Sequence, residues 1–115
     1  EMIHYGVTKT AQLGLSRGLA ELSRGTGVTA NCVLPGPTMS EGVGKWIREL
    51  AEKEGITIEE AGKQFIRDSR PASLLGRPAD TDEVANLVVY LASPLSSATN
   101  GAALRVDGGV YRSIL

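Results

Sequence analysis

Tyr5 and Lys9 are the first residues along the chain whose types and spacing suggest catalysis. They are four residues apart at the start of a predicted helix, so both side chains lie on one face, one turn apart. A phenol has a reference pKa of about 10, and a nearby ammonium group lowers that pKa because it favours the phenolate. The pair is therefore a candidate general acid/base. The spacing alone is common by chance, and an ordinary surface tyrosine and lysine are the alternative.

Other reactive residue types are scarce. His4 is the only histidine and Cys32 the only cysteine, so these residues form neither a multi-ligand zinc site nor an internal disulfide. We predict no metal site, and we expect Cys32 to be a small core residue in a reducing compartment. Residues 25–30 spell G-x-G-x-x-A, but they follow a helix and enter a strand. That order is the reverse of a dinucleotide-binding loop, which we therefore exclude.

Helical periodicity predicts where these residues are positioned. A helix is expected over 7–24, where apolar residues recur at spacings of three and four and glycines follow. Residues 41–53 are amphipathic around Trp46. Thr57-Ile58-Glu59-Glu60 has capping-box spacing and predicts a helix to about Arg70. Asp80 and Glu83 have the same capping spacing, which predicts a helix over 80–93. The apolar stripe of the first helix consists of Ala11, Leu15, Leu19 and Leu22.

Two short β-branched, apolar segments are predicted strands. Residues 28–34 are expected to form a buried strand that Pro35-Gly36-Pro37 ends, and residues 102–106 a second one. Strands separated by helices form a right-handed parallel crossover, and a parallel sheet needs neighbouring strands and cover on both faces. Two strands do not make such a sheet. The sequence therefore predicts an α/β fold that is incomplete as a domain.

Four motifs occur in a distinctive order. They are Tyr5-x-x-x-Lys9, the segment 31–38 with Pro35-Gly36-Pro37-Thr38, the Gly76-Arg77-Pro78 turn, and Val106-Asp107-Gly108-Gly109. In this order, over residues 2–111, they resemble the C-terminal half of the short-chain dehydrogenase/reductase family. The resemblance implies that residues 1–115 are the C-terminal portion of a Rossmann-like, doubly wound parallel sheet, with two strands and about four helices.

The resemblance also implies an activity. The parent protein would be an oxidoreductase that transfers a hydride between NAD or NADP and a small carbonyl or alcohol substrate. Tyr5 would protonate the developing alkoxide, or act as the base in the reverse direction. Lys9 would bind the hydroxyls of the nicotinamide ribose and assist Tyr5.

Cofactor contacts are implied at the end of the first strand. Pro35 and Gly36 would lie beside the nicotinamide ring, where a glycine lets the backbone approach closely. Thr38 would reach the carboxamide or the pyrophosphate, and Ser40 offers a second hydroxyl for that contact. The choice between NAD and NADP cannot be read from these residues.

The helices of region 40–70 match the family's variable segment, which shapes the substrate pocket. Trp46 and Phe65 are candidate pocket residues, with lid or core packing as the alternative. Asp107-Gly108-Gly109 is expected to be a structural turn near an oligomer contact.

The family's catalytic serine, its glycine-rich loop and its mid-fold asparagine have no counterpart in these residues. The isolated chain is therefore expected to bind cofactor poorly and to be inactive. A non-enzymatic oligomerisation or binding fragment is the alternative function, because the 7–24 helix and the last helix and strand match surfaces with which family members form dimers and tetramers.

The composition excludes several partners. The formal net charge of −1 gives no electrostatic footprint for nucleic acid or an anionic membrane surface. The longest mainly apolar stretch, residues 84–92, is too short to span a membrane, and the first residues do not resemble a signal peptide. We expect a cytoplasmic protein that forms a homo-oligomer, a dimer or tetramer.

Overall fold

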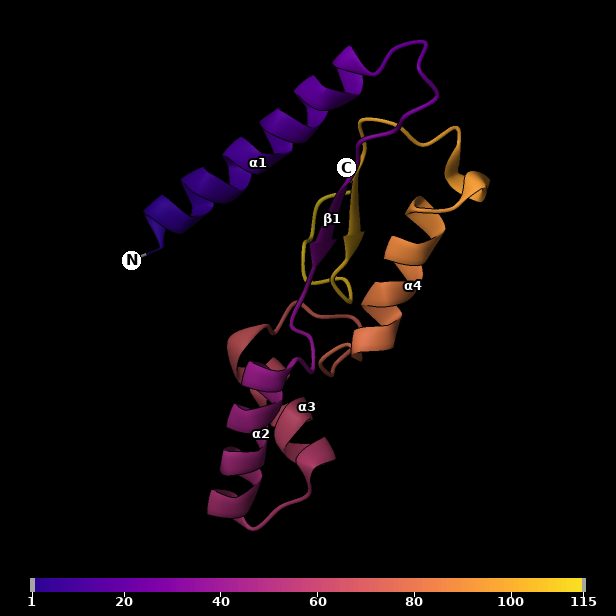
Figure 1. Cartoon of the computed structure of the whole chain (residues 1–115). Helices are drawn as coiled ribbons and strands as arrows, with labels where there is room; N and C mark the ends of the chain where they lie inside the picture. The colour runs from indigo at the N-terminus through magenta and orange to yellow at the C-terminus, as the bar shows by residue number, and fades with distance from the viewer. Residues whose placement is uncertain (1, 115) are drawn as a thin grey trace. The chain divides into compact units, whose positions relative to one another are not determined.

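The computed structural model describes residues 2–114. The elements follow the order α1 (Ile3–Leu22), β1 (Cys32–Pro35), α2 (Glu41–Glu54), α3 (Ile58–Ser69), α4 (Thr81–Leu91), a 3₁₀ turn η1 (Pro94–Ser96) and β2 (Ala103–Val106). β1 and β2 pair in a two-stranded sheet and run in the same direction (Figure 1). The predicted α/β architecture of four helices and two parallel strands is confirmed.

The chain divides into two compact units. One contains the residues up to 34 together with 87–104, and the other contains 35–86 together with the residues from 105 onward. Both strands and α4 run from one unit into the other, so each unit holds part of the sheet.

In the first unit, α1 differs from its expected form. It begins at Ile3, four residues earlier than expected. The prediction started too late because it relied on the apolar stripe, and the first turn of the helix lacks that stripe. The stripe was expected to face a core, yet Leu15, Leu19 and Leu22 are 64%, 51% and 82% exposed. Ala20 is the one residue of α1 that is buried. The apolar face of α1 is therefore exposed to solvent within the described residues.

The first strand starts later than predicted. Residues 28–31 precede β1, and side-chain amides share the pairing there with one backbone bond, from the Gly101 N–H to the Ala30 carbonyl at 2.9 Å. Asn100 Oδ1 accepts the Ala30 N–H at 2.9 Å, and Asn31 Oδ1 accepts the Ala102 N–H at 3.0 Å. Regular strand pairing begins where the Cys32 N–H donates to the Ala102 carbonyl at 2.8 Å. The strand is half-buried rather than buried, and Cys32 is likewise half-buried.

In the second unit, α2 and α3 pack side by side and form a small core (Figure 1). Ile47, Ala51 and Ala61 are its buried centre. The predicted capping box at the start of α3 is present: Thr57 Oγ1 accepts the Glu60 N–H at 3.2 Å, and Glu60 Oε2 accepts the Thr57 N–H at 3.0 Å. This pair satisfies two backbone donors that the first turn of a helix otherwise leaves free.

An ion pair holds the start of α4. The guanidinium of Arg77 donates to both carboxylate oxygens of Glu83, each at 2.8 Å. Glu83 also accepts the backbone N–H of Asp80 at 2.8 Å. These bonds, the one to Arg77 first, lower the pKa of Glu83 from its usual 4.5 to about 2. The loop before α4 is thereby fixed to the first turn of the helix.

Candidate functional site

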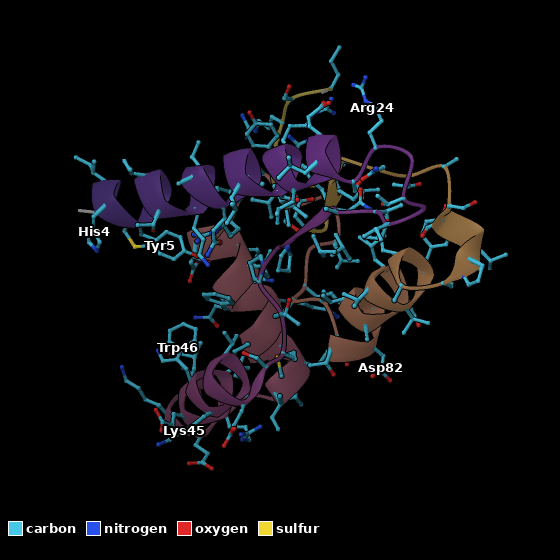
Figure 2. All side chains as sticks on the ribbon, turned by 45° about the horizontal axis from the view of Figure 1, so that its top comes forward. His4, Tyr5, Arg24, Lys45, Trp46 and Asp82 are labelled. Carbon is cyan, nitrogen blue, oxygen red and sulfur yellow. The ribbon has the colours of Figure 1, made fainter. Side chains whose placement is uncertain are left out.

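Tyr5 and Lys9 lie together near the N-terminal end of α1. Both side chains are exposed, and the Lys9 ammonium lies 5.6 Å from the centroid of the Tyr5 ring, within the range of a cation–π contact. Figure 2 shows the Tyr5 side chain projecting from α1 next to His4. Lys9 Nζ also donates to Gln12 Oε1 at 3.4 Å. The helix therefore presents a phenol and an ammonium group side by side to solvent.

Four of the six candidate cofactor residues lie in the second unit, on the segment that leaves β1, whereas Tyr5 and Lys9 lie on α1 in the first unit. The Gly36 N–H donates to the Val106 carbonyl at 3.2 Å. Thr38 Oγ1 donates to the Gly36 carbonyl at 2.9 Å, which keeps the lone pairs of the hydroxyl available. Ser40 is the N-cap of α2 and is exposed, as is Pro35. The segment therefore offers hydroxyls and backbone groups at the carboxyl end of a parallel strand, the usual place for ligands in α/β sheets.

Gly36 packs directly on the turn after β2. A Cβ atom at this position would lie 2.6 Å from the Asp107 carbonyl oxygen, closer than real Cβ contacts allow. The Asp107 carboxylate accepts the backbone N–H groups of Gly109 at 2.9 Å and Tyr111 at 3.2 Å. This supports the expectation of a structural turn at 107–109. The missing side chain of Gly36 therefore serves the packing of the two strand ends.

A cavity of about 400 Å³ opens beside this segment. Phe65 lines it, whereas Trp46 is not a lining residue and packs against Phe65, edge to face at a centroid separation of 4.9 Å. The sequence interpretation did not identify Arg70, Asp107 or Val110 as lining residues. They come from distant stretches of chain, and no local spacing indicates that they meet. The complete lining is Pro35, Gly36, Pro37, Val43, Phe65, Arg70, Asp107 and Val110.

Within residues 2–114, no group of three or more His, Cys, Asp or Glu side chains is placed to hold a metal ion. No helix in this range is long and apolar enough to cross a membrane.

Comparison with known proteins identifies related sequences. The family model described as "Enoyl-(Acyl carrier protein) reductase" matches residues 1–111. The uncharacterized oxidoreductase YvaG of Bacillus subtilis strain 168 is 51% identical over 99% of this chain. That match covers 43% of YvaG, so the chain spans less than half the length of this curated relative.

Solved structures show the same fold. The short-chain oxidoreductase of Pseudomonas aeruginosa PAO1, described as containing an atypical catalytic center, superposes with a TM-score of 0.85 at 30% identity, over 98% of this chain and 42% of that one. L-Sorbose reductase of Gluconobacter frateurii, solved with NADPH and L-sorbose, superposes with a TM-score of 0.80 at 27% identity, over 96% of this chain and 41% of that one. The two strands and four helices therefore correspond to part of a larger Rossmann-like sheet.

Proposed function

The chain belongs to the short-chain dehydrogenase/reductase family, and from that premise we propose that the protein containing it transfers a hydride between NAD(P)H and a small carbonyl or alcohol substrate. The observation that carries the proposal is the placement of Tyr5 and Lys9 on one face of α1, with the ammonium 5.6 Å from the phenol ring.

Tyr5 is the acid and base of this reaction. In the reducing direction its hydroxyl donates a proton to the carbonyl oxygen as that oxygen gains negative charge, and in the oxidising direction the phenolate accepts the alcohol proton. The hydroxyl has no hydrogen-bond partner among residues 2–114, so it is available to a substrate. Lys9 lies beside the ring, with its ammonium group 5.6 Å from the ring centroid.

Each of the candidate cofactor residues, taken by itself, has a chemistry that suits the nicotinamide half of the cofactor. The nicotinamide supplies the hydride donor or acceptor. Lys9 carries ammonium donors suited to ribose hydroxyls, and Thr38 carries a hydroxyl oxygen suited to the carboxamide, with Ser40 as a second hydroxyl on the same segment. Pro35 and Gly36 offer a surface with little side-chain bulk for the ring. The fit of NADPH to L-sorbose reductase supports a nicotinamide cofactor here.

Exchange of Tyr5 for phenylalanine tests the proposal. In the protein containing this chain, Tyr5→Phe removes the transferred proton but keeps the ring, so we expect turnover to fall at least about 100-fold. NAD(P)H affinity, measured by fluorescence titration, stays within twofold. Tyr90→Phe, a change of the same kind on α4, serves as the matched control and keeps full activity. Turnover retained in Tyr5→Phe contradicts the proposal.

The 115-residue polypeptide by itself is expected to be inactive, since it spans 43% of its relative. A non-enzymatic oligomerisation unit is the second candidate, and the exposed Leu15, Leu19 and Leu22 on α1 favour it. Titration of the isolated polypeptide with NADH and NADPH separates the two: saturable, tight binding contradicts a purely structural unit. We also propose a cytoplasmic location, because Cys32, the only cysteine in these 115 residues, is a free thiol.

A further inference from the structure

Arg70 stands out among the residues that line the cavity beside Pro35 and Gly36. It is the C-cap of α3, and its backbone is fixed on both sides. Its N–H donates to the Ile66 carbonyl at 2.8 Å, and its carbonyl accepts the Ser73 N–H at 2.9 Å. The α-carbon from which the guanidinium extends is therefore held firmly.

The guanidinium of Arg70 has no acidic partner within residues 2–114. Its Nη1 donates to the neighbouring Ser69 carbonyl at 2.6 Å. The other N–H donors of the guanidinium remain available to a ligand. The arginines of the ion pairs differ, since Arg17 is paired with Glu21 and Arg77 with Glu83. Arg70 is thus an exposed cation on a held backbone, without an acidic partner among the described residues.

No carboxylate of the cavity lining forms an ion pair with the Arg70 guanidinium. Asp107 is the only acidic residue that lines it, and its two carboxylate oxygens accept the backbone N–H groups of Gly109 and Tyr111. The other walls are apolar, from Val43, Phe65 and Val110 together with the proline-glycine segment. A volume of about 400 Å³ lies in the range of small-molecule sites. The cavity suits a small molecule with an apolar body and one negatively charged end.

We propose that the substrate carries a carboxylate and that Arg70 binds this group, which makes the protein a reductase of small oxo acids, or a dehydrogenase of the corresponding hydroxy acids. This rests on the proposed function, because Pro35 and Gly36 are the residues assigned to the nicotinamide ring and they line the same cavity. A planar guanidinium binds a carboxylate through two parallel hydrogen bonds, and this fixes the orientation of the substrate as well as its affinity.

A structural role for Arg70 makes a different prediction. A cation at a helix C-terminus interacts favourably with the last carbonyl groups of the helix. If that were its whole purpose, the loss of the charge would affect stability and leave the choice between charged and neutral substrates unchanged. Arg67, an exposed arginine in the last turn of the same helix, provides the matched control.

The test uses the full protein and pairs of substrates with one carbon skeleton: a series of small 2- and 3-oxo acids and their methyl esters. We expect the wild type to prefer the acid of a pair. Arg70→Gln lowers kcat/KM for the acid at least about tenfold, because a hydrogen bond to a charged group is lost. The kcat/KM for the ester changes less than twofold. Arg70→Lys restores part of the preference, and Arg67→Gln leaves both values unchanged.

The outcomes separate this inference from the proposed function. Equal use of acid and ester by the wild type, or an equal loss for both in Arg70→Gln, overturns the carboxylate proposal. Activity that still depends on Tyr5 then leaves the hydride-transfer proposal standing. A protein that binds NAD(P)H but reduces none of the oxo acids also overturns the carboxylate proposal. Retained turnover in Tyr5→Phe contradicts the proposed function instead.

Discussion

Gly36 has a packing role in the structure in addition to the cofactor role proposed for it. The resemblance to the dehydrogenase family assigns it to the cofactor side of the strand end, where a side chain would block a close approach. The structure adds a second reason, because the Asp107 carbonyl occupies the place where a Cβ atom would lie. A substitution here therefore disturbs the junction of β1 and β2 whether or not a cofactor binds.

Gly36→Ala is expected to lower the free energy of unfolding by about 1–3 kcal/mol, the usual cost of an added atom in a filled space. Gly42→Ala is the control, since a Cβ atom at Gly42 in α2 meets nothing within 4 Å. That helical substitution is expected to stabilise by about 0.5–1 kcal/mol. Urea denaturation of the two variants measures both values. Equal stability of Gly36→Ala and wild type contradicts the packing argument.

At this scale the sequence was informative wherever residues are close along the chain. Tyr5 and Lys9 could be placed on one face because the helical repeat brings residues i and i+4 together. Arg70 and Asp107 could not be assigned to the cavity, because 36 positions separate them and their meeting depends on how α3 and β2 return to the end of β1.

The start of α4 shows the same contrast at the scale of an element. The acidic residues after Asp80 predicted a helix start, and α4 does begin at Thr81. The partner of Glu83 was not predicted, because Arg77 lies in the preceding loop, where no periodic pattern places its side chain. Likewise, the late start of β1 depends on the amides of Asn31 and Asn100, which act across about 70 residues of chain.

The Arg77–Glu83 pair predicts a pH dependence of stability. The folded-state pKa of Glu83 is about 2, below its usual 4.5, so the carboxylate stabilises the fold fully above about pH 4.5, and this contribution is lost as the pH falls towards 2. We expect Glu83→Gln to lower the Tm at pH 7 and the difference from wild type to shrink steadily below pH 4.5. Thermal denaturation from pH 2 to 7 measures it.

Asp82→Asn is the control for that experiment, because Asp82 lies on the same first turn (Figure 2) and has no side-chain partner in the described residues. It is expected to change the Tm by less than Glu83→Gln at pH 7. A difference between Glu83→Gln and wild type that stays constant down to pH 2 contradicts the assigned role of the ion pair.

At the scale of the whole molecule, the exposed apolar residues of α1 are the main departure from the expected packing. A stripe at helical spacing predicts burial but does not say which surface buries it. Within residues 2–114 that surface is absent for Leu15, Leu19 and Leu22. An exposed stripe of this kind favours association.

We therefore expect the isolated polypeptide to form dimers or larger assemblies. Leu19→Lys places a charge in the middle of the stripe and is expected to shift the polypeptide towards monomer. Leu95→Lys, at a leucine in η1 that is more exposed than Leu19 (82% against 51%), is the control and leaves the association unchanged. Sedimentation velocity over a range of concentrations measures both, and a wild-type polypeptide that stays monomeric throughout contradicts the prediction.

The edge-to-face contact between Trp46 and Phe65 has a spectroscopic consequence. Trp46 is the only tryptophan of the chain. Its ring contacts Phe65, and Phe65 lines the cavity. A ligand that displaces the Phe65 ring alters the surroundings of the indole, so the emission of Trp46 changes without any added dye. Stopped-flow fluorescence of Trp46 then measures the rate at which a ligand enters the cavity, independently of the rate of turnover.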